Sequence, residues 1–444
     1  MRKVFFLSCT MALAIASIAQ PIPEKLDTLI SAYHREDGYN GTVLVARGGA
    51  VLLEKGYGYK NKQARSLNDR NTIFQIGSIT KQFTSALILQ LMEQGKLSLS
   101  DKLSKFFPDY PHGDSISIEN LLTHESGVWN YTNDAPLMMS RAARPIDRDS
   151  LIAYFKYKPL GFSPGTKYSY SNSGYVLLGY IIEKVSGKPW FRVMHERIFG
   201  PLHMDHSGFD FAGLKSPDKA TGYNSPSSDQ PALVVDSSVS FAAGSIYTTV
   251  EDLYKWDRAL YTGRIISEAS LQKAFTPHLG KYGYGWMMDS VYGKKVVEHG
   301  GGIPGFLSFI FRVPEDQTCI IIFDNMPIRD PGKMAGAINA LLNGKDYTIP
   351  RPKVVLRVDT VILKQYAGKY ELAPGFVMTV TLENGKLMAQ AGGQPKLELF
   401  AEKENVFYPR EIDAHLEFVR GADSSVEKLI LNQGGQVRTA NRIK

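Results

Sequence analysis

The sequence predicts an α+β fold: an antiparallel sheet flanked by terminal helices, with a mostly helical insertion, followed by a small all-β, barrel-like domain. Apolar runs bounded by turn residues lie near both ends of residues 20–345, as expected for strands of one sheet. Residues 97–240 between them mix short helical patterns with loops rich in Pro, Gly, Ser and Asn. Strands that open and close a unit around a helical middle are typical of an α+β plan.

The elements of the first unit follow from hydrophobic periodicity. Helices are expected at 23–33, 79–94, 251–260 and 332–343, and strands at 41–46, 51–57, 282–289, 294–298, 305–313 and 318–324. The helix at 79–94 is apolar on nearly every side from Phe83 to Met92, which predicts a buried central position. Gly95 suits the end of that helix, because glycine readily adopts the left-handed conformation found there.

The last part of the chain is predicted to be an independent all-β domain. The two runs 377–381 and 386–390 flank Asn384-Gly385, which is typical of a two-residue hairpin turn. Further strands are expected at 396–400, 405–408, 414–420 and 426–431. This pattern fits both a sandwich and a barrel.

The N-terminus has the pattern of a secretory signal peptide. A basic pair precedes the mostly apolar stretch 4–16, and small residues at 17 and 19 fit cleavage before Gln20. The alternative is an uncleaved membrane anchor, but the apolar stretch is shorter than the ~18–20 residues that span a bilayer. No other stretch is long and apolar enough to span, so we expect no membrane span after removal of the signal. The mature protein would be exported, to the periplasm or the extracellular space. The expected organisation is a signal peptide at 1–19, a first domain at 20–345, a linker at 346–358 and an all-β domain at 359–444.

Composition argues against several classes of function. Lysine and arginine exceed aspartate and glutamate by 51 − 44 = 7 without a dense basic run, so nucleic-acid binding has little support. His195, His203 and His206 lie close in sequence, but His195-Glu196 is followed by Phe199 where a zinc motif needs histidine. We therefore expect no metal and no other cofactor. Cys319, alone after signal cleavage, is expected to be a buried strand thiol.

The strongest candidate for chemistry is Ser78 with Lys81, at the start of the buried helix. Free N–H groups and the helix dipole favour negative charge at this end of a helix. Lys81 shares the face of Ser78, and burial disfavours its charged form, so the pair can act as nucleophile and base. Three other Ser-x-x-Lys patterns occur, so the bare pattern is weak, and Ser78 with Lys81 also fits an ordinary capping serine with a surface lysine. Ser78 is distinguished by the apolar helix that it opens.

Two further segments carry polar groups suited to a site. Tyr170 and Asn172 stand in a polar loop before the apolar run 176–182, where a phenol can relay protons and an amide can bind a substrate amide. His299 and Gly301 belong to a glycine-rich strand, and consecutive glycines in a strand indicate close approach of a ligand or another backbone. Taken singly, each pattern also fits an ordinary turn.

In this order, Ser-x-x-Lys, Tyr-x-Asn and His-x-Gly resemble the serine hydrolases related to class C β-lactamases, D-alanyl-D-alanine carboxypeptidases and low-molecular-weight penicillin-binding proteins. The resemblance spans roughly residues 22–345 and implies a β-lactamase/transpeptidase-like fold. Residues 362–444 resemble the barrel-like tail of many members. Further matching stretches are Phe74–Lys81, Leu121–Gly127 (LLTHESG), Phe241–Gly244 with Thr249 and Asp252, and Tyr282–Trp286.

The resemblance implies a role for each site residue. Ser78 would be the acylated nucleophile, Lys81 its base or proton relay, and Tyr170 the group that shuttles protons to the leaving group. Backbone N–H groups of Ser78 and Gly302 would form the oxyanion hole. The substrate-binding residues would be Asn172, His299, Gly301 and Gly302, and the candidate wall residues are Trp129, Asn130 and Tyr131.

One position departs from the β-lactamases, which carry lysine where this chain has His299. A permanent cation helps to bind a substrate carboxylate and to lower the pKa of the tyrosine. Lowering that pKa from about 10 to 7 needs roughly 4 kcal/mol. A mostly neutral histidine supplies less, so acyl transfer is expected here without an efficient phenolate base.

We expect a secreted serine acyl hydrolase that forms an acyl-enzyme on Ser78. Its substrates would be small amides or esters, D-amino-acid peptides first, so that its partner is a small molecule or a short peptide. A β-lactamase is the alternative within the same chemistry. A catalytically silent binder of cell-wall peptide is the alternative of another class. The Gly-x-Ser-x-Gly elbow of α/β-hydrolases is absent from the sequence.

Overall fold

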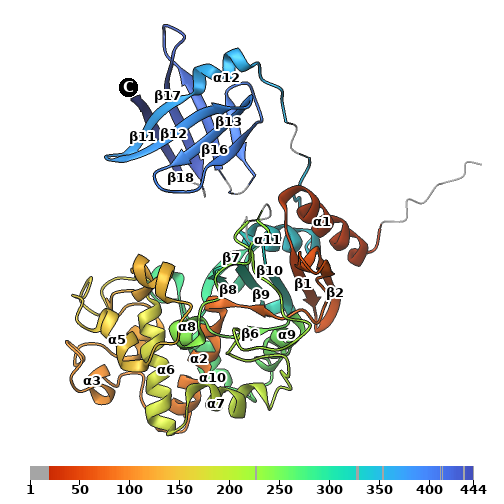
Figure 1. The fold of residues 1–444 in the computed structure, drawn as a ribbon. Helices are drawn as coiled ribbons and strands as arrows, with labels where there is room; N and C mark the ends of the chain where they lie inside the picture. The colour runs from red at the N-terminus through yellow and green to blue at the C-terminus, as the bar shows by residue number, and fades with distance from the viewer. Residues whose placement is uncertain are drawn as a thin grey trace, which may run out of the picture.

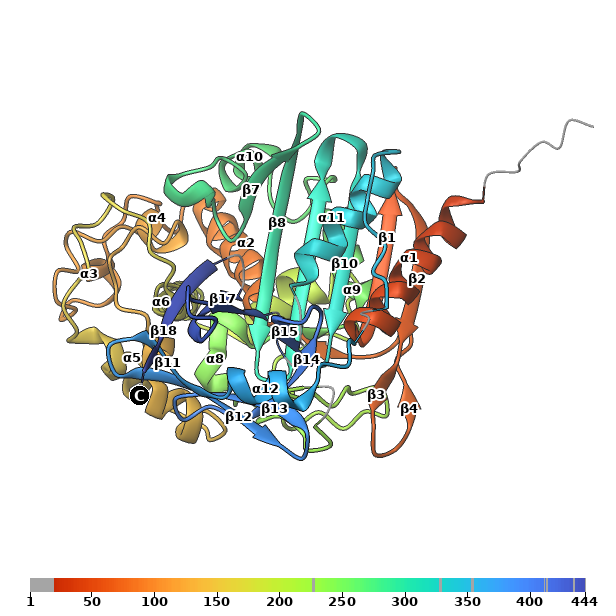
Figure 2. The same ribbon diagram turned by 90° about the horizontal axis from the view of Figure 1, so that it is seen from above.

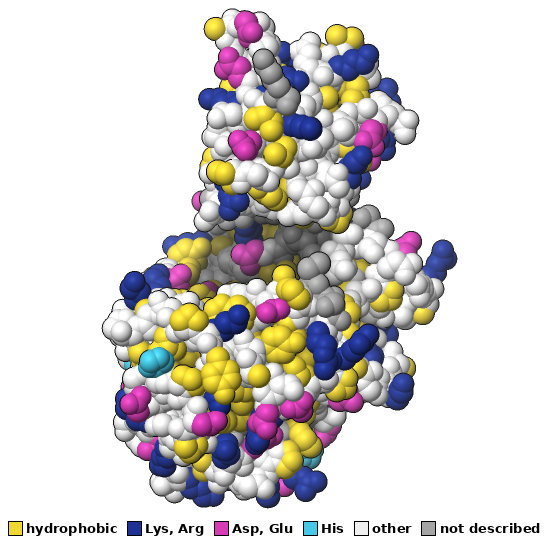
Figure 3. Space-filling view, turned by 60° about the vertical axis from the view of Figure 1, so that its left-hand side comes forward, with side chains coloured by type: hydrophobic (Ala, Val, Ile, Leu, Met, Phe, Trp, Pro, Cys, Tyr) yellow, Lys and Arg dark blue, Asp and Glu magenta, His cyan; other side chains and the backbone are white. Residues whose placement is uncertain are grey.

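The computed structural model describes residues 20–225, 228–326, 330–352, 355–410, 412, 414–433 and 436–443. The signal peptide predicted at 1–19 lies outside the described residues. The described chain forms a domain built on a six-stranded sheet and a closed eight-stranded barrel. Figure 1 shows the barrel apart from the sheet domain, and Figure 3 shows a hollow between the two, with side chains of both charges interspersed on the surface.

The six-stranded sheet is antiparallel throughout and joins the two ends of the first domain. Its order is β2-β1-β10-β9-β8-β7, and Val43 on β1 pairs with Ile322 on β10. The N-terminal hairpin and the C-terminal meander therefore share one sheet, which confirms the predicted plan. The strands are β1 (Gly41–Arg47), β2 (Ala50–Tyr57), β7 (Met287–Val291), β8 (Lys294–Ile303), β9 (Phe306–Val313) and β10 (Thr318–Asp324).

Helices cover both faces of this sheet. The terminal helices α1 (Ile22–Asp37) and α11 (Pro331–Leu342) lie on one face, and α9 (Val250–Ala259) lies on the other (Figure 2). Side chains alternate accordingly, because successive residues of a strand point to opposite faces. Val43 packs in the cluster of α1 and α11, whereas Leu44 packs in the larger core on the other side.

The central helix of that larger core is α2 (Thr80–Glu93), which follows a 3-10 turn, η1 (Gly77–Ile79). Every residue of α2 from Thr80 to Leu91 is buried, as its apolar sequence predicts. The remaining helices of the domain are α3 (Leu103–Phe106), α4 (Ile118–Leu122), α5 (Arg148–Lys156), α6 (Asn172–Ser186), α7 (Trp190–Met194), α8 (Ser237–Gly244) and α10 (Glu268–Ala274). Short strand pairs are β3 (Tyr59–Asn61) with β4 (Ser66–Leu67), and β5 (Phe74–Gln75) with β6 (Tyr247–Thr248).

The C-terminal domain is a closed antiparallel barrel preceded by α12 (Thr360–Tyr366), which decides between the sandwich and barrel alternatives. Closure pairs β11 with β18, two strands that the sequence patterns did not predict. In β18 the hydrophobic signal is weak, because only Ala440 of its eight residues is buried. The strands are β11 (Gly368–Ala373), β12 (Phe376–Glu383), β13 (Lys386–Ala391), β14 (Leu397–Ala401), β15 (Val406–Pro409), β16 (Ala414–Arg420), β17 (Val426–Gln433) and β18 (Gln436–Ile443).

One expected strand was misplaced. The run 282–289 was predicted to be extended, but β7 begins only at Met287, and Tyr282–Trp286 form a turn. Gly285 has a φ of 79°, and a Cβ there would lie 2.7 Å from the carbonyl oxygen of Lys81. The aromatic run therefore packs against the start of α2 instead of extending the sheet.

Among the described helices, none has both the length and the apolar character needed to cross a membrane. Cys319 lies buried on β10 as a free thiol, and burial raises its pKa well above the ordinary value.

Candidate active site

Ser78 lies in the turn η1, immediately before α2, with its side chain partly exposed. The preceding Gly77 has a φ of 48°, and a Cβ at that position would meet the backbone nitrogen of Gly302 at 2.9 Å. Only glycine fits both the dihedral angle and the space. The close approach brings the nucleophile candidate to the glycine-rich strand β8, although 224 residues separate Ser78 from Gly302.

Lys81 is completely buried one turn further along. Its Nζ lies 3.0 Å from Ser78 Oγ, 2.7 Å from Asn172 Oδ1 and 2.8 Å from the carbonyl oxygen of Ala243. Burial holds the pKa of Lys81 well below its ordinary value. The alternative of a surface lysine beside a capping serine is therefore wrong for this pair.

The three partners of Lys81 determine what its amine can do. A neutral amine has two N–H donors and one lone pair. The oxygens of Asn172 and Ala243 can only accept, so they take both donors. The lone pair is left for the one partner that also carries a proton, the hydroxyl of Ser78. The neutral amine is thus oriented to accept the proton of the nucleophile.

The carbonyl of Ala243 comes from the end of α8, where the last carbonyls of a helix lack intrahelical donors. Ala242, beside it, accepts a hydrogen bond from Thr84 of α2 at 2.8 Å. Phe241 has a φ of 36°, which kinks α8 just before these two residues. The stretch Phe241–Gly244, singled out in the sequence without a role, therefore orients the lysine.

Asn172 begins α6, and its amide is held from both sides. Its Oδ1 accepts from Lys81, its Nδ2 donates to Thr132 Oγ1 at 3.1 Å, and its backbone N–H donates to Asn130 Oδ1 at 3.0 Å. These bonds place the carbonyl end of the amide toward the lysine. In this arrangement Asn172 positions the amine of Lys81 and also borders the cleft beside Ser78.

Tyr170 lies beside both the hydroxyl of Ser78 and the amine of Lys81. The Nζ of Lys81 stands 4.9 Å from the centre of its ring. Burial raises the pKa of Tyr170 above its ordinary value, and a hydrogen bond with Ser78 lowers it only in part. The side chain is therefore a neutral phenol with a proton to donate. This agrees with the expectation, based on histidine rather than lysine at position 299, that Tyr170 is not an efficient phenolate base.

His299 is buried on β8, with 3% of its surface exposed. Its Nδ1 lies 2.6 Å from the carbonyl oxygen of Gly300, so this nitrogen carries the proton and donates it. Its Nε2 then accepts from the hydroxyl of Tyr282 at 2.8 Å. Burial, aided by the nearby Lys81, lowers the pKa of His299 to about 3. The histidine is thus neutral at physiological pH and supplies no cation.

The glycines of β8 leave room for the segment that carries the nucleophile. A Cβ on Gly301 would lie 2.0 Å from the carbonyl oxygen of Ile76, whereas the nearest neighbour of one on Gly300 would be the Phe309 ring, at an ordinary contact distance of 3.5 Å. Ser308 on β9 donates to the same Ile76 carbonyl at 2.8 Å. This buried serine, which the sequence patterns did not indicate, fixes the distance between the sheet and η1.

A cleft of about 180 Å³ opens beside Ser78. Of the predicted wall residues Tyr131 lines it, while Asn130 holds Asn172 and Trp129 packs partly buried against the main core. The cleft also includes residues that the sequence did not single out. Its further lining includes Thr132, Met138, Val235, Ser240, Ile303 and Pro304, all of them uncharged.

His124 is a site residue whose role sequence reasoning missed. Its carbonyl oxygen accepts from the N–H of Ser169 at 2.9 Å, and its Nδ1 accepts from the N–H of Ser171 at 3.1 Å. These are the two neighbours of Tyr170, and the ring of Tyr170 lies 4.2 Å from that of His124. His124 therefore holds the loop that presents the phenol. Its presence in the stretch LLTHESG was the only available signal.

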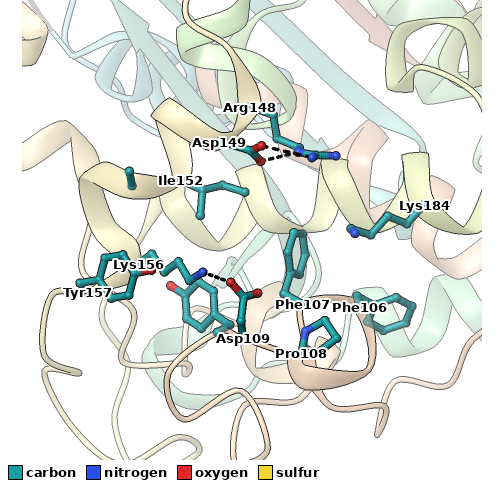
Figure 4. A pocket seen from close by; sticks show the side chains of 12 residues that line it. Phe106, Phe107, Pro108, Asp109, Arg148, Asp149, Ile152, Lys156, Tyr157 and Lys184 are labelled. Carbon is teal, nitrogen blue, oxygen red and sulfur yellow. Dashed lines mark hydrogen bonds and ion pairs between the residues drawn. The ribbon is translucent and has the colours of Figure 1, made fainter.

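A larger hollow of about 390 Å³ lies elsewhere, between α3, α5 and the end of α6 (Figure 4). Four of its charged side chains pair with each other, Lys156 with Asp109 at 2.5 Å and Arg148 with Asp149 at 2.9 Å, while the Nζ of Lys184 lies 4.9 Å from the centre of the Phe107 ring. Its lining offers no serine or histidine. This hollow is larger than the cleft at Ser78, but its lining lacks a nucleophile with an adjacent base, which Ser78 and Lys81 provide at the smaller cleft.

Among the described residues, no group of three or more His, Cys, Asp or Glu side chains is placed to hold a metal ion.

Comparison with known families places these features in context. A family model described as Beta-lactamase matches residues 26–342, and a domain of unknown function, DUF3471, matches residues 353–440. Penicillin-binding protein 4* of Bacillus subtilis is 30% identical over 446 residues, which cover 94% of this chain and 98% of that protein.

Solved structures show the same likeness. The octameric penicillin-binding protein homologue from Pyrococcus abyssi has a TM-score of 0.65 at 27% identity and covers 94% of this chain and 99% of its own. A D-stereospecific amidohydrolase from Streptomyces sp. has a TM-score of 0.58 at 25% identity and covers 68% of this chain and 93% of its own.

Proposed function

The chain belongs to the Beta-lactamase family of serine hydrolases, and we propose that it is an active member, a serine acyl hydrolase that forms an acyl-enzyme on Ser78. The observation that carries the proposal is the contact between Ser78 Oγ and the buried amine of Lys81 at 3.0 Å. A silent binder would not need a desolvated amine beside its serine, because burying that group without a charge partner destabilises the fold.

Acylation begins when Ser78 attacks the carbonyl carbon of the substrate. Lys81 accepts the hydroxyl proton through its free lone pair as the bond between Oγ and carbon forms. General-base assistance of this kind typically contributes 10²- to 10⁴-fold, a magnitude of roughly 3–5 kcal/mol. The bonds from Lys81 to Asn172 and Ala243 persist throughout, so the amine keeps its orientation.

The developing oxyanion would be stabilised by the backbone N–H groups of Ser78 and Gly302. Support comes from the close approach of Gly77 to the backbone nitrogen of Gly302, which brings the turn η1 and strand β8 together beside Ser78. One such donor typically contributes roughly 3–4 kcal/mol to lowering the barrier.

The leaving group departs with a proton, for which Tyr170 is the closest acid. Its raised pKa keeps the phenol protonated, and its hydrogen bond with Ser78 places it at the reacting centre. Tyr170 protonates the departing nitrogen or oxygen as its bond to the carbonyl carbon breaks. The phenol is then restored by the proton that Lys81 took from Ser78. Water then cleaves the ester at Ser78 by the same route in reverse order.

The substrate class we propose is a small amide or ester, with D-amino-acid derivatives first. The uncharged cleft supports an uncharged group next to the scissile bond. Likeness to a D-stereospecific amidohydrolase supports D-configured substrates. A β-lactamase is the less favoured candidate, because neutral His299 provides no cation for a substrate carboxylate.

We also propose that the protein is exported, on the N-terminal pattern of basic, apolar and small residues. N-terminal sequencing of the mature protein should find Gln20 as its first residue. A first residue of Met1 or Cys9 would contradict this.

The test of the enzyme is intact mass after incubation with a fluorophosphonate, a penicillin and a p-nitrophenyl ester. We expect an adduct or turnover with the wild type and with Ser216→Ala, whose serine belongs to another Ser-x-x-Lys pattern, and loss of both in Ser78→Ala. The ranking of the three reagents separates esterase and amidase from β-lactamase. Folded wild type that gives neither adduct nor turnover would favour the silent binder.

A further inference from the structure

The interior of the barrel is filled by side chains at one end and contains a cavity at the other. At the filled end, α12 brings Tyr366 against Phe418, with ring centres 4.5 Å apart and stacked, and Phe407 packs beside them. At the opposite end lies a cavity of about 190 Å³ inside the ring of strands. Eight-stranded barrels are just wide enough to be filled by side chains or to hold one small ligand.

The hollow exists because small residues replace large ones at inward positions. Inward side chains alternate along each strand, and Ala389, Ala391 and Ala414 occupy such positions around the cavity. At the filled end the corresponding layer carries the aromatic rings. The inner wall is otherwise hydrocarbon, contributed by Leu372, Phe376, Met378, Leu399, Leu416 and Leu431.

The rim of the cavity is polar. Gln394, Gln433 and Arg438 are exposed there, and Arg438 pairs directly with Leu431 of the inner wall. Among the described lining residues, Arg438 alone carries a charge. A guanidinium at the mouth of an apolar cavity is complementary to a carboxylate that ends an apolar chain.

We propose that this barrel, which matches a domain of unknown function, binds a small amphipathic carboxylate. Its hydrocarbon part occupies the cavity, and its carboxylate lies at Arg438. A cavity of about 150 Å³ accommodates benzene, so this one, of about 190 Å³, holds a group of roughly seven or eight non-hydrogen atoms. A medium-length fatty acid or an aryl-substituted acid has the required size and polarity. The site is separate from Ser78 and does not depend on the proposed hydrolase activity.

Two methionines allow the two cavities to be observed in one experiment. Met378 lines the barrel cavity and Met138 lines the cleft at Ser78. Full-length Ser78→Ala protein, labelled with ¹³C at the methionine methyl groups, is titrated with hexanoate, octanoate and decanoate. The two resonances are assigned with Met378→Leu and Met138→Leu. The inactive variant excludes any signal that arises from turnover.

We expect a saturable shift of the Met378 resonance, with affinity rising about fourfold per added methylene until the cavity is full. Arg438→Gln should weaken octanoate binding about tenfold, while Arg420→Gln, at the filled end of the barrel, should leave it unchanged. Ala414→Phe fills the cavity and should abolish the shift. Ala391→Leu, at a half-exposed position near the mouth, makes the same test if Ala414→Phe does not fold.

Three results would overturn the proposal. The Met378 resonance could fail to shift at saturating octanoate. The shift could persist unchanged when the cavity is filled in either alanine variant. Arg438→Gln and Arg420→Gln could weaken binding equally, which would indicate a general effect of surface charge. Failure of Ser78 to be acylated would leave all three measurements interpretable, so the two proposals fail separately.

Discussion

The amine of Lys81 lies 3.0 Å from the hydroxyl of Ser78, and its two other partners are uncharged oxygens, of Asn172 and Ala243. Lys81 therefore has no carboxylate to stabilise its ammonium form, and burial favours the neutral base.

Replacing this base should abolish most of the activity. Lys81→Met keeps the volume but has no lone pair of comparable basicity, so kcat/KM for a p-nitrophenyl ester should fall by about 10²- to 10⁴-fold. The matched control is Lys273→Met, an exposed lysine of another Ser-x-x-Lys pattern, which should retain wild-type activity. Equal activity in the two variants would exclude Lys81 as the base.

The pH profile should report the same amine. Activity requires neutral Lys81, so kcat/KM rises with pH as the amine loses its proton and then levels off. Because burial lowers this pKa, the midpoint should lie well below the ordinary 10.5 of lysine. The measurement is kcat/KM against pH with an amide substrate, which limits uncatalysed hydrolysis. A rise centred near 10.5 would contradict the neutral-base mechanism.

His124 should act on catalysis through the loop that carries Tyr170. Its φ of 61° is tolerated by asparagine far better than by alanine, and the Oδ1 of asparagine can accept the Ser171 N–H in place of Nδ1. We expect His124→Ala to lower kcat about tenfold or more with a smaller change in KM, and His124→Asn to restore much of the loss. Thermal unfolding of both variants separates positioning from stability. Equal kcat in the two variants would argue against the hydrogen bond.

Adjacent glycines of β8 should respond differently to the same methyl group. Gly301→Ala places a Cβ 2.0 Å from the carbonyl oxygen of Ile76, so η1 must move and activity should fall at least 10²-fold. Gly300→Ala makes an ordinary contact with Phe309 and should stay within about threefold of wild type. The measurement is kcat/KM of each variant relative to wild type, with circular dichroism to confirm that both variants fold. Similar losses in both would indicate general damage to the strand.

His299 should make the first domain sensitive to acid. Its pKa is about 3 in the folded protein against 6.5 in the unfolded chain, so between these values the unfolded state binds more protons. Its contribution to stability is therefore present above pH 6.5 and is lost as pH falls toward 3. Between pH 7 and pH 4 this amounts to about 3 kcal/mol.

The measurement is the free energy of unfolding in urea at pH 7 and pH 4, for wild type and His299→Gln. All four tryptophans, Trp129, Trp190, Trp256 and Trp286, precede the barrel, so their fluorescence reports the first domain. The difference between the two pH values should be smaller in His299→Gln, because glutamine does not titrate. Other buried groups cancel in this comparison. An identical pH dependence would contradict the neutral, buried histidine.

The sequence by itself determined what depends on neighbours along the chain. Ser78 and Lys81 share a face because three residues separate them in a helix, and the apolar run after them requires burial. The strands at both ends of the first domain were predictable from their apolar runs, as was the hairpin at Asn384-Gly385. Here the spacing of side chains alone sets the structure.

Tertiary structure decided what depends on partners distant in sequence. Burial keeps Lys81 neutral and its bonds to Asn172 and Ala243 orient it. The proton on His299 is placed by Gly300 and Tyr282. Pattern alone could not show that Tyr282–Trp286 turn against α2 rather than extend, nor that a strand as polar as β18 closes the barrel. Hydrophobic periodicity records which residues avoid water. Desolvation, hydrogen-bond orientation and strand closure arise only once distant segments meet.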